Sequence, residues 1–150
     1  MFKYLIIFLF CFIYPEFINI DQAQKIAINK SIYNGIKNPK IQSIHTIHAK
    51  SFPVIYAINI HNNGFILIAA DDRVFPVLGY SNSNSYSDDN HPTQFKDMLN
   101  SFKEQISYVI DNNSIASNKI KDKWSLYLSE KVELNNSRTV TPLMSTVWDQ

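Results

Sequence analysis

Residues 54–81 contain three short apolar runs separated by turn residues, and this pattern constrains the fold more than any other stretch of the chain. In residues 54–60 a strongly apolar face alternates with a mixed face, which is the period-two pattern of a β-strand. Asn62 and Gly64 follow, and both residue types tolerate the positive φ angles of a tight hairpin loop. We therefore expect residues 65–70 to fold back along the first strand.

A third strand should complete an antiparallel meander. Asp71, Asp72 and Arg73 predict a polar turn, solvated or ion-paired, after which residues 74–80 form another apolar run. Pro76 lacks a backbone N–H and favours an edge position or a bulge in this run. Such a sheet has an apolar face that is only marginally stable until other elements cover it.

Helical patterns elsewhere supply those covers. A first helix should begin near Asp21, which can cap it, and end at Asn34 and Gly35. Pro92 opens the longest amphipathic pattern, and a shorter helix should follow near residues 120–128. We interpret the stripe of the long helix as core, and it consists of Phe95, Met98, Leu99, Phe102, Ile106, Val109 and Ile110.

The predicted fold class is α+β, with an antiparallel hairpin and meander sheet and helices packed on one face. Residues 41–47 are a further candidate strand. With 45% hydrophobic residues among 150, the chain can form one small domain with a proper core. A formal net charge of +1 gives no electrostatic case for nucleic-acid binding.

The N-terminal segment predicts export. Lys3 precedes an apolar run in residues 5–14 that is too short to span a bilayer, which is typical of a secretory signal. We assign residues 1–18 to an approximate signal peptide and expect a secreted or periplasmic protein without a stable membrane anchor. The single cysteine, Cys11, lies inside this segment, so the mature chain should have neither a disulfide nor a catalytic thiol.

No other chemistry is apparent in the sequence. His45 and His48 would point to opposite faces of a strand, so we interpret them as solvent-facing residues and expect no metal site. Asp71 and Asp72 are adjacent at a strand end, where their side chains point apart, so we do not expect acid–base catalysis there. With three glycines the chain has no phosphate-binding loop, and we expect no cofactor.

A family resemblance runs through the sheet region. A strand tyrosine followed by GFILIAADDRVFPVLGYS resembles the propeptides of streptopain-type cysteine proteases and their stand-alone Spi inhibitors. The residues that carry it are Tyr56, Gly64, Phe65, Ile66, Ile68, Asp71, Asp72, Arg73, Pro76, Val77, Leu78, Gly79 and Tyr80.

Residues 140–150, VTPLMSTVWDQ, are similar to the opening of the catalytic domain in the same family. The resemblance implies that Gln150 corresponds to the oxyanion-hole glutamine, whose amide would donate to a developing oxyanion. Gln150 alone catalyses nothing, so no catalytic set is complete. The structural alternative is an apolar segment that docks on the domain through Trp148.

The resemblance divides the chain into four parts. After the signal, residues 19–132 are an inhibitor or propeptide domain, residues 133–139 a linker, and residues 140–150 the start of a truncated catalytic domain. The implied function is to hold a streptopain-like, papain-fold cysteine protease inactive, in cis or in trans. The alternatives are an N-terminal fragment of a protease precursor and a secreted, non-enzymatic binding module.

The polar segment before the long helix is our candidate inhibitory loop. It sits between the hairpin and the helix, so both of its ends are fixed while its tip is free to enter a cleft. Its side chains offer hydrogen bonds without a well-aligned scissile bond. The candidate residues are Asp88, Asp89, Asn90, His91, Pro92, Thr93 and Gln94.

Overall fold

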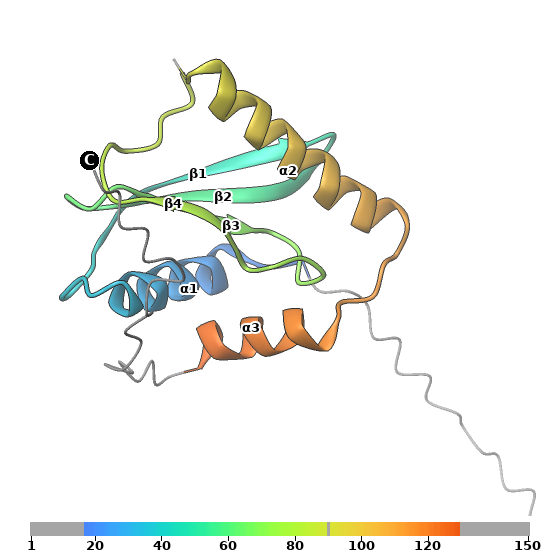
Figure 1. The fold of residues 1–150 in the computed structure, drawn as a ribbon, viewed down its shortest axis with the longest axis horizontal. Helices are drawn as coiled ribbons and strands as arrows, with labels where there is room; N and C mark the ends of the chain where they lie inside the picture. Colours follow the sequence, from blue (N-terminus) through green and yellow to red (C-terminus); the bar gives the residue numbers. More distant parts are fainter. Residues whose placement is uncertain (1–16, 90, 130–150) are drawn as a thin grey trace, which may run out of the picture.

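The structure is a computed structural model that describes residues 17–89 and 91–129. Its elements follow in the order α1 (Ile20–Tyr33), β1 (Ile41–Ala49), β2 (Phe52–Ile60), β3 (Phe65–Ala69), β4 (Val77–Ser81), α2 (Thr93–Asp111) and α3 (Asn118–Leu128). The four strands form one antiparallel sheet (Figure 1). The expected α+β class is confirmed, and residues 41–47 belong to a strand.

The sheet is a meander in the order β1-β2-β3-β4, with β1 and β4 at its edges. The hairpin between β2 and β3 uses positive φ angles at Asn62 (57°) and Gly64 (76°), as predicted. A Cβ at Gly64 would collide with the backbone of Ser81, so only glycine fits this turn. Pro76 directly precedes the edge strand β4, whose register with β3 is irregular near its start.

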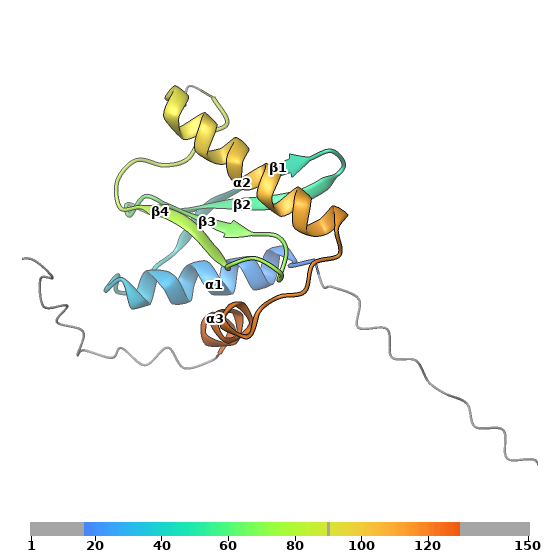
Figure 2. The ribbon, with the colours of Figure 1, turned by 45° about the vertical axis from the view of Figure 1, so that its right-hand side comes forward.

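Helices cover the sheet on both faces, which corrects the expectation of one covered face. In β2 the side chain of Tyr56 contacts the segment that leads into α1, whereas Asn59, of opposite parity, contacts Tyr86 beside α2. Residues 54–60 are all buried. α1 and α3 lie below the sheet and α2 above it (Figures 1 and 2). Helices on both faces are needed because β2 is apolar at nearly every position, so apolar side chains point to both faces of the sheet.

α1 begins slightly earlier in the chain than expected, because its N-cap is Asn19 and not Asp21. The Asn19 side chain accepts a hydrogen bond from the Gln22 backbone N–H (2.9 Å), and the Gln22 side chain accepts one from Asn19 (3.0 Å). This reciprocal pair is a capping box, so Asp21 lies within the first turn and is not the cap. The helix ends at Tyr33 with Asn34 as its C-cap, and Gly35 follows with φ of 88°, as expected.

The turn after β3 is an ion pair, and it is buried. Asp71 is 1% exposed and Arg73 is 7% exposed. Oδ1 of Asp71 accepts from the backbone N–H and from Nε–H of Arg73 (3.0 and 2.8 Å), and Oδ2 accepts from an Nη of Arg73 (2.6 Å). These hydrogen bonds raise the pKa of Arg73, with the charges of Asp71 and Asp72 acting in the same direction and burial opposing them.

Most of the stripe of the long helix packs on the core. Leu99 and Ile106 are buried and Phe102 is half-buried, but Met98 is 37% exposed, so its assignment to the core is wrong. α3 is the expected short helix, and its Trp124 is buried and donates Nε1–H to the carbonyl of Val74 (2.8 Å). α3 therefore fastens the chain after α2 to the turn that precedes β4.

Several expectations concern residues outside the described ranges. These are Cys11 and most of the signal segment, Asn90, the linker 133–139, and residues 140–150 with Trp148 and Gln150. They stay predictions. Of the helices in the described residues, none combines the length and the apolar character that crossing a membrane requires.

We predict that Ile106→Ala destabilises the fold by about 2 to 5 kcal/mol, because it removes fully buried methyl groups and leaves a cavity that the surrounding side chains fill only in part. Tyr108→Ala is the matched control, since Tyr108 lies on the same helix and is 66% exposed. Urea unfolding measures both. Equal unfolding free energies for the two variants would mean that α2 does not pack on the sheet through Ile106.

Candidate functional site

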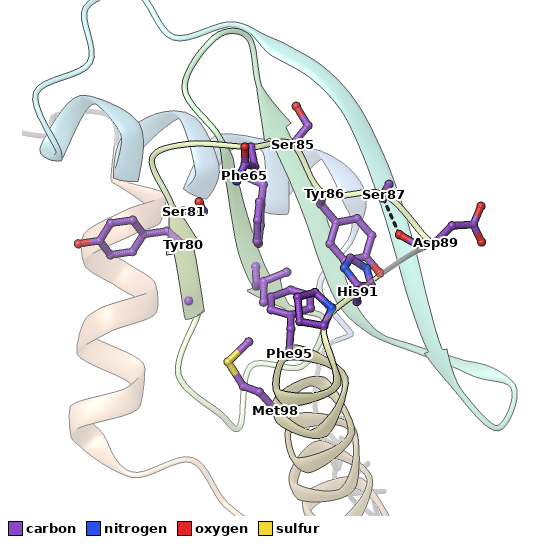
Figure 3. A pocket seen from close by; sticks show the side chains of 14 residues that line it. Phe65, Tyr80, Ser81, Ser85, Tyr86, Ser87, Asp89, His91, Phe95 and Met98 are labelled. Carbon is purple, nitrogen blue, oxygen red and sulfur yellow. Dashed lines mark hydrogen bonds between the residues drawn. The ribbon is translucent and has the colours of Figure 1, made fainter.

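A pocket of about 590 Å³ opens beside β4, against the loop that follows it and the first turns of α2 (Figure 3). We call it the β4 pocket. Aromatic and methionine side chains make its apolar part, and serine hydroxyls make much of its polar part. The residues that line it include Phe65, Gly79, Tyr80, Ser81, Ser85, Tyr86, Ser87, Asp89, His91, Phe95 and Met98.

One buried amide fixes the loop that borders the pocket. Asn59, in β2, is 2% exposed. Its Oδ1 accepts from the backbone N–H of Tyr86 (2.7 Å), and its Nδ2 donates to the carbonyl of Tyr86 (2.9 Å) and to Oγ of Ser43 (2.8 Å). The amide therefore satisfies both backbone groups of Tyr86, as an adjacent strand would.

Tyr86 in turn anchors the start of α2. Its ring lies 5.9 Å from that of Phe65, 4.9 Å from that of His91 and 6.3 Å from that of Phe95. His91 and Phe95 also contact each other, with ring centroids 4.7 Å apart. These side chains gather where the loop meets α2 (Figure 3). The apolar side of the β4 pocket is thus built on the sheet and does not depend on a free loop.

The loop tip is held yet exposed. Nδ1 of His45, on β1, lies 2.9 Å from Oδ2 of Asp88, whose side chain is 68% exposed. Oγ of Ser87 donates to the carbonyl of Asp89 (2.9 Å). The pKa of Tyr86 is raised, first by burial and then by the charge of Asp88 and a hydrogen bond with it. The tip therefore presents carboxylates to solvent from a fixed base.

The candidate inhibitory residues fall into two groups. Asp88 and Asp89 are at the exposed tip, while His91 and Pro92 border the pocket. Asn90 lies outside the described residues. Thr93 and Gln94 form the first turn of α2 with Pro92 as N-cap, so their assignment to a loop is wrong. Proline at the N-cap leaves the helix to start at the very next residue.

The family-motif residues also separate by location. Phe65, Gly79 and Tyr80 line the β4 pocket. The others build the sheet and its ends: Tyr56 anchors the N-terminal segment, Gly64 makes the hairpin, Asp71 and Arg73 form the buried pair, Asp72 lies beside them, and Pro76 and Leu78 flank the start of β4.

Sequence reasoning missed Asn59, Tyr86 and Met98. Asn59 did carry a signal, because a polar residue inside an apolar central strand needs a buried partner. Tyr86 was an aromatic residue in an otherwise polar loop, and such a residue often packs down onto the core. Met98 gave no signal, since its spacing matches that of the buried residues on α2.

Metal and acid–base chemistry find no support in these contacts. His45 and His48 lie on β1 three residues apart; His48 is exposed as expected, but His45 is half-buried and bonded to Asp88, which corrects that expectation. Within residues 17–89 and 91–129, no group of three or more histidine, cysteine or acidic side chains could hold a metal ion.

A family model described as Spi protease inhibitor matches residues 15–106. This match covers more than half of the chain. The chain belongs to the Spi protease inhibitor family. The matched residues include the sheet, the loop and most of α2, and thus the whole β4 pocket of this Spi domain. No match was found among curated proteins or among solved structures.

We predict that Asn59→Ala loosens the loop of the Spi domain, because the backbone N–H and carbonyl of Tyr86 lose their buried partner, at a cost of about 1 to 3 kcal/mol. Hydrogen exchange of the Tyr86 amide should speed up more than that of β3. Asn63→Ala is the control, since Asn63 bonds only within the exposed hairpin turn. If Tyr86 stays protected in Asn59→Ala, the loop is held by its aromatic contacts instead.

Proposed function

We propose that this chain is an exported Spi-type domain that holds a streptopain-like, papain-fold cysteine protease inactive, in cis or in trans, and is not itself an enzyme. The single observation that carries the proposal is the convergence of two sets of residues on one site. Phe65, Gly79 and Tyr80 of the family motif line the same pocket as Asp89 and His91 of the candidate inhibitory loop.

The proposed contact with the protease is the loop tip, residues 87–90. A segment that is already fixed loses less conformational entropy on binding than a free peptide. Here the base of the tip is fixed by Asn59 and by the tilted ring contact of His91 with Tyr86. The exposed carboxylates of Asp88 and Asp89 can accept hydrogen bonds from the cleft of a protease without offering it a scissile bond in register.

Replacing residues 88–90 by Gly-Ser-Gly tests this proposal. The change keeps Tyr86, His91 and the α2 start, so the fold should persist. We expect the inhibition constant against a streptopain-type protease to rise about tenfold or more, which corresponds to a loss of about 1.4 kcal/mol or more. The matched control carries the same replacement at residues 113–115, in the exposed α2–α3 loop.

Circular dichroism of both variants should match that of the parent. Equal inhibition constants for parent, tip variant and control would overturn the assignment of the tip. No inhibition by the parent of any streptopain-type protease would overturn the proposed target class.

We further propose that the exported chain is cut before Phe17, a little earlier than the boundary suggested by the sequence. Ile18 is 4% exposed, its N–H donates to the carbonyl of Ala70 (3.0 Å), and its carbonyl accepts from Tyr56 Oη (2.9 Å). The ring of Phe17 stacks on that of Phe52. Loss of these residues would open the core.

Expression with secretion and mass spectrometry of the mature protein should therefore give an N-terminus at or before Phe17. Retention of residues 1–16 in a non-exported protein would contradict export. A mature N-terminus at Ile18 or later would contradict the proposed cleavage position. Intracellular protein expressed from Phe17 and from Asn19 provides the comparison, and only the longer form should keep the parent melting temperature.

A further inference from the structure

The α2 side of β4 is left without a cover. α2 contacts β1 and β2, the strands at the other side of the sheet. Gly79, in β4, offers no side chain to the β4 pocket, and a Cβ built there would meet only Cδ1 of Leu67, at 4.0 Å. Among the described residues β4 pairs with β3 alone, so its outer backbone groups have no strand beside them. An open edge of this kind readily accepts an added strand.

The lining of the pocket favours an aromatic side chain that carries a hydrogen-bond donor. Phe65, Phe95 and Met98 provide an apolar surface, and Met98 is a soft, adaptable contact for an aromatic ring. Ser81, Ser85 and Ser87 provide hydroxyl oxygens at the polar part. The indole of tryptophan matches both properties, because its ring is apolar and its Nε1–H only donates.

The described chain ends close to this edge. Nδ2 of Asn29, on α1, donates to the carbonyls of Tyr127 (2.6 Å) and Ser129 (3.2 Å), which fixes the end of α3 against α1. The next residue of α1, Lys30, places its Nζ 5.0 Å from the ring centroid of Tyr80, on β4. Ser129, the last described residue, therefore lies where the segment after it can reach the β4 edge.

The segment that follows has a fitting composition. Residues 130–139 are mainly polar and can span about 30 Å when extended. Residues 140–148, VTPLMSTVW, are apolar or hydroxylated throughout and carry no charge. In an extended segment Met144, Thr146 and Trp148 share one face, because side chains alternate. One face can thus present the tryptophan while the backbone pairs with β4.

We propose that residues 140–148 of this chain add to the open edge of β4 as an extended segment and place the Trp148 side chain in the β4 pocket. The Spi domain would then hold in cis the segment that resembles the opening of a catalytic domain. The inference rests on the pocket, the open edge and the position of Ser129, and not on the proposed inhibition, and its test contains no protease.

Fluorine NMR of the full chain labelled with fluorotryptophan tests the proposal. The chain has two tryptophans, so two signals are expected. Trp148→Phe assigns them without touching a described residue. Exchange of light for heavy water should change the chemical shift of the Trp148 signal only slightly, as it should for buried Trp124, because a buried ring meets little solvent.

Gly79→Val should abolish this protection, since the new side chain fills the pocket from a strand position that has room for it. Met98→Lys, at a position that is already 37% exposed, should do so independently. Tyr108→Val, at the far end of α2, is the control and should leave the signal unchanged. An unaltered Trp124 signal verifies that each variant is folded.

Three results would overturn the proposal. A Trp148 signal as sensitive to solvent as free fluorotryptophan would show that the segment is undocked. Protection that survives both pocket variants would place the segment elsewhere. Protection that disappears on dilution would show that the occupant comes from a second copy of the chain.

Discussion

The side-chain amide of Asn59 is the contact on which the site depends. It sits in the central strand β2, where neither of its polar groups can reach bulk water, and an unpaired buried amide is costly. Pairing both groups with the backbone of Tyr86 satisfies them and holds the following loop against the sheet. The aromatic contacts of Tyr86 and the exposed tip then follow from a single buried requirement.

The Asp71–Arg73 pair imposes a similar requirement at the opposite end of β3. Burying two charges is expensive, and the pair is tolerable because one carboxylate receives three hydrogen bonds. The turn that it closes also carries the carbonyl of Val74, which accepts from Trp124. Breaking the pair would therefore release both the β3–β4 turn and α3. The main effect of the pair is thus to position these two elements.

The sequence indicates the strands and the hairpin well, because period-two alternation and an Asn-Gly turn follow from local geometry. The same local reasoning fails where a distant element decides the outcome. Asp71, Asp72 and Arg73 indicate a turn that is solvated or ion-paired, and only the packing of distant segments decides that the Asp71–Arg73 pair is buried. Met98 matches the spacing of Leu99 and Ile106, and only the lateral position of α2 on the sheet leaves it exposed.

That lateral position also explains why a pocket exists at this place. The chain leaves β4 at one edge of the sheet, but α2 packs over β1 and β2. The connection from β4 to α2 must therefore cross the face of the sheet that α2 covers. On the way, its Tyr86 backbone N–H donates to Asn59, on β2. Because the crossing segment and the helix both pass beside β4 without covering it, Gly79 and its neighbours stay open. The exposed edge is thus a consequence of the connectivity, and any segment that docks there completes the cover of the sheet.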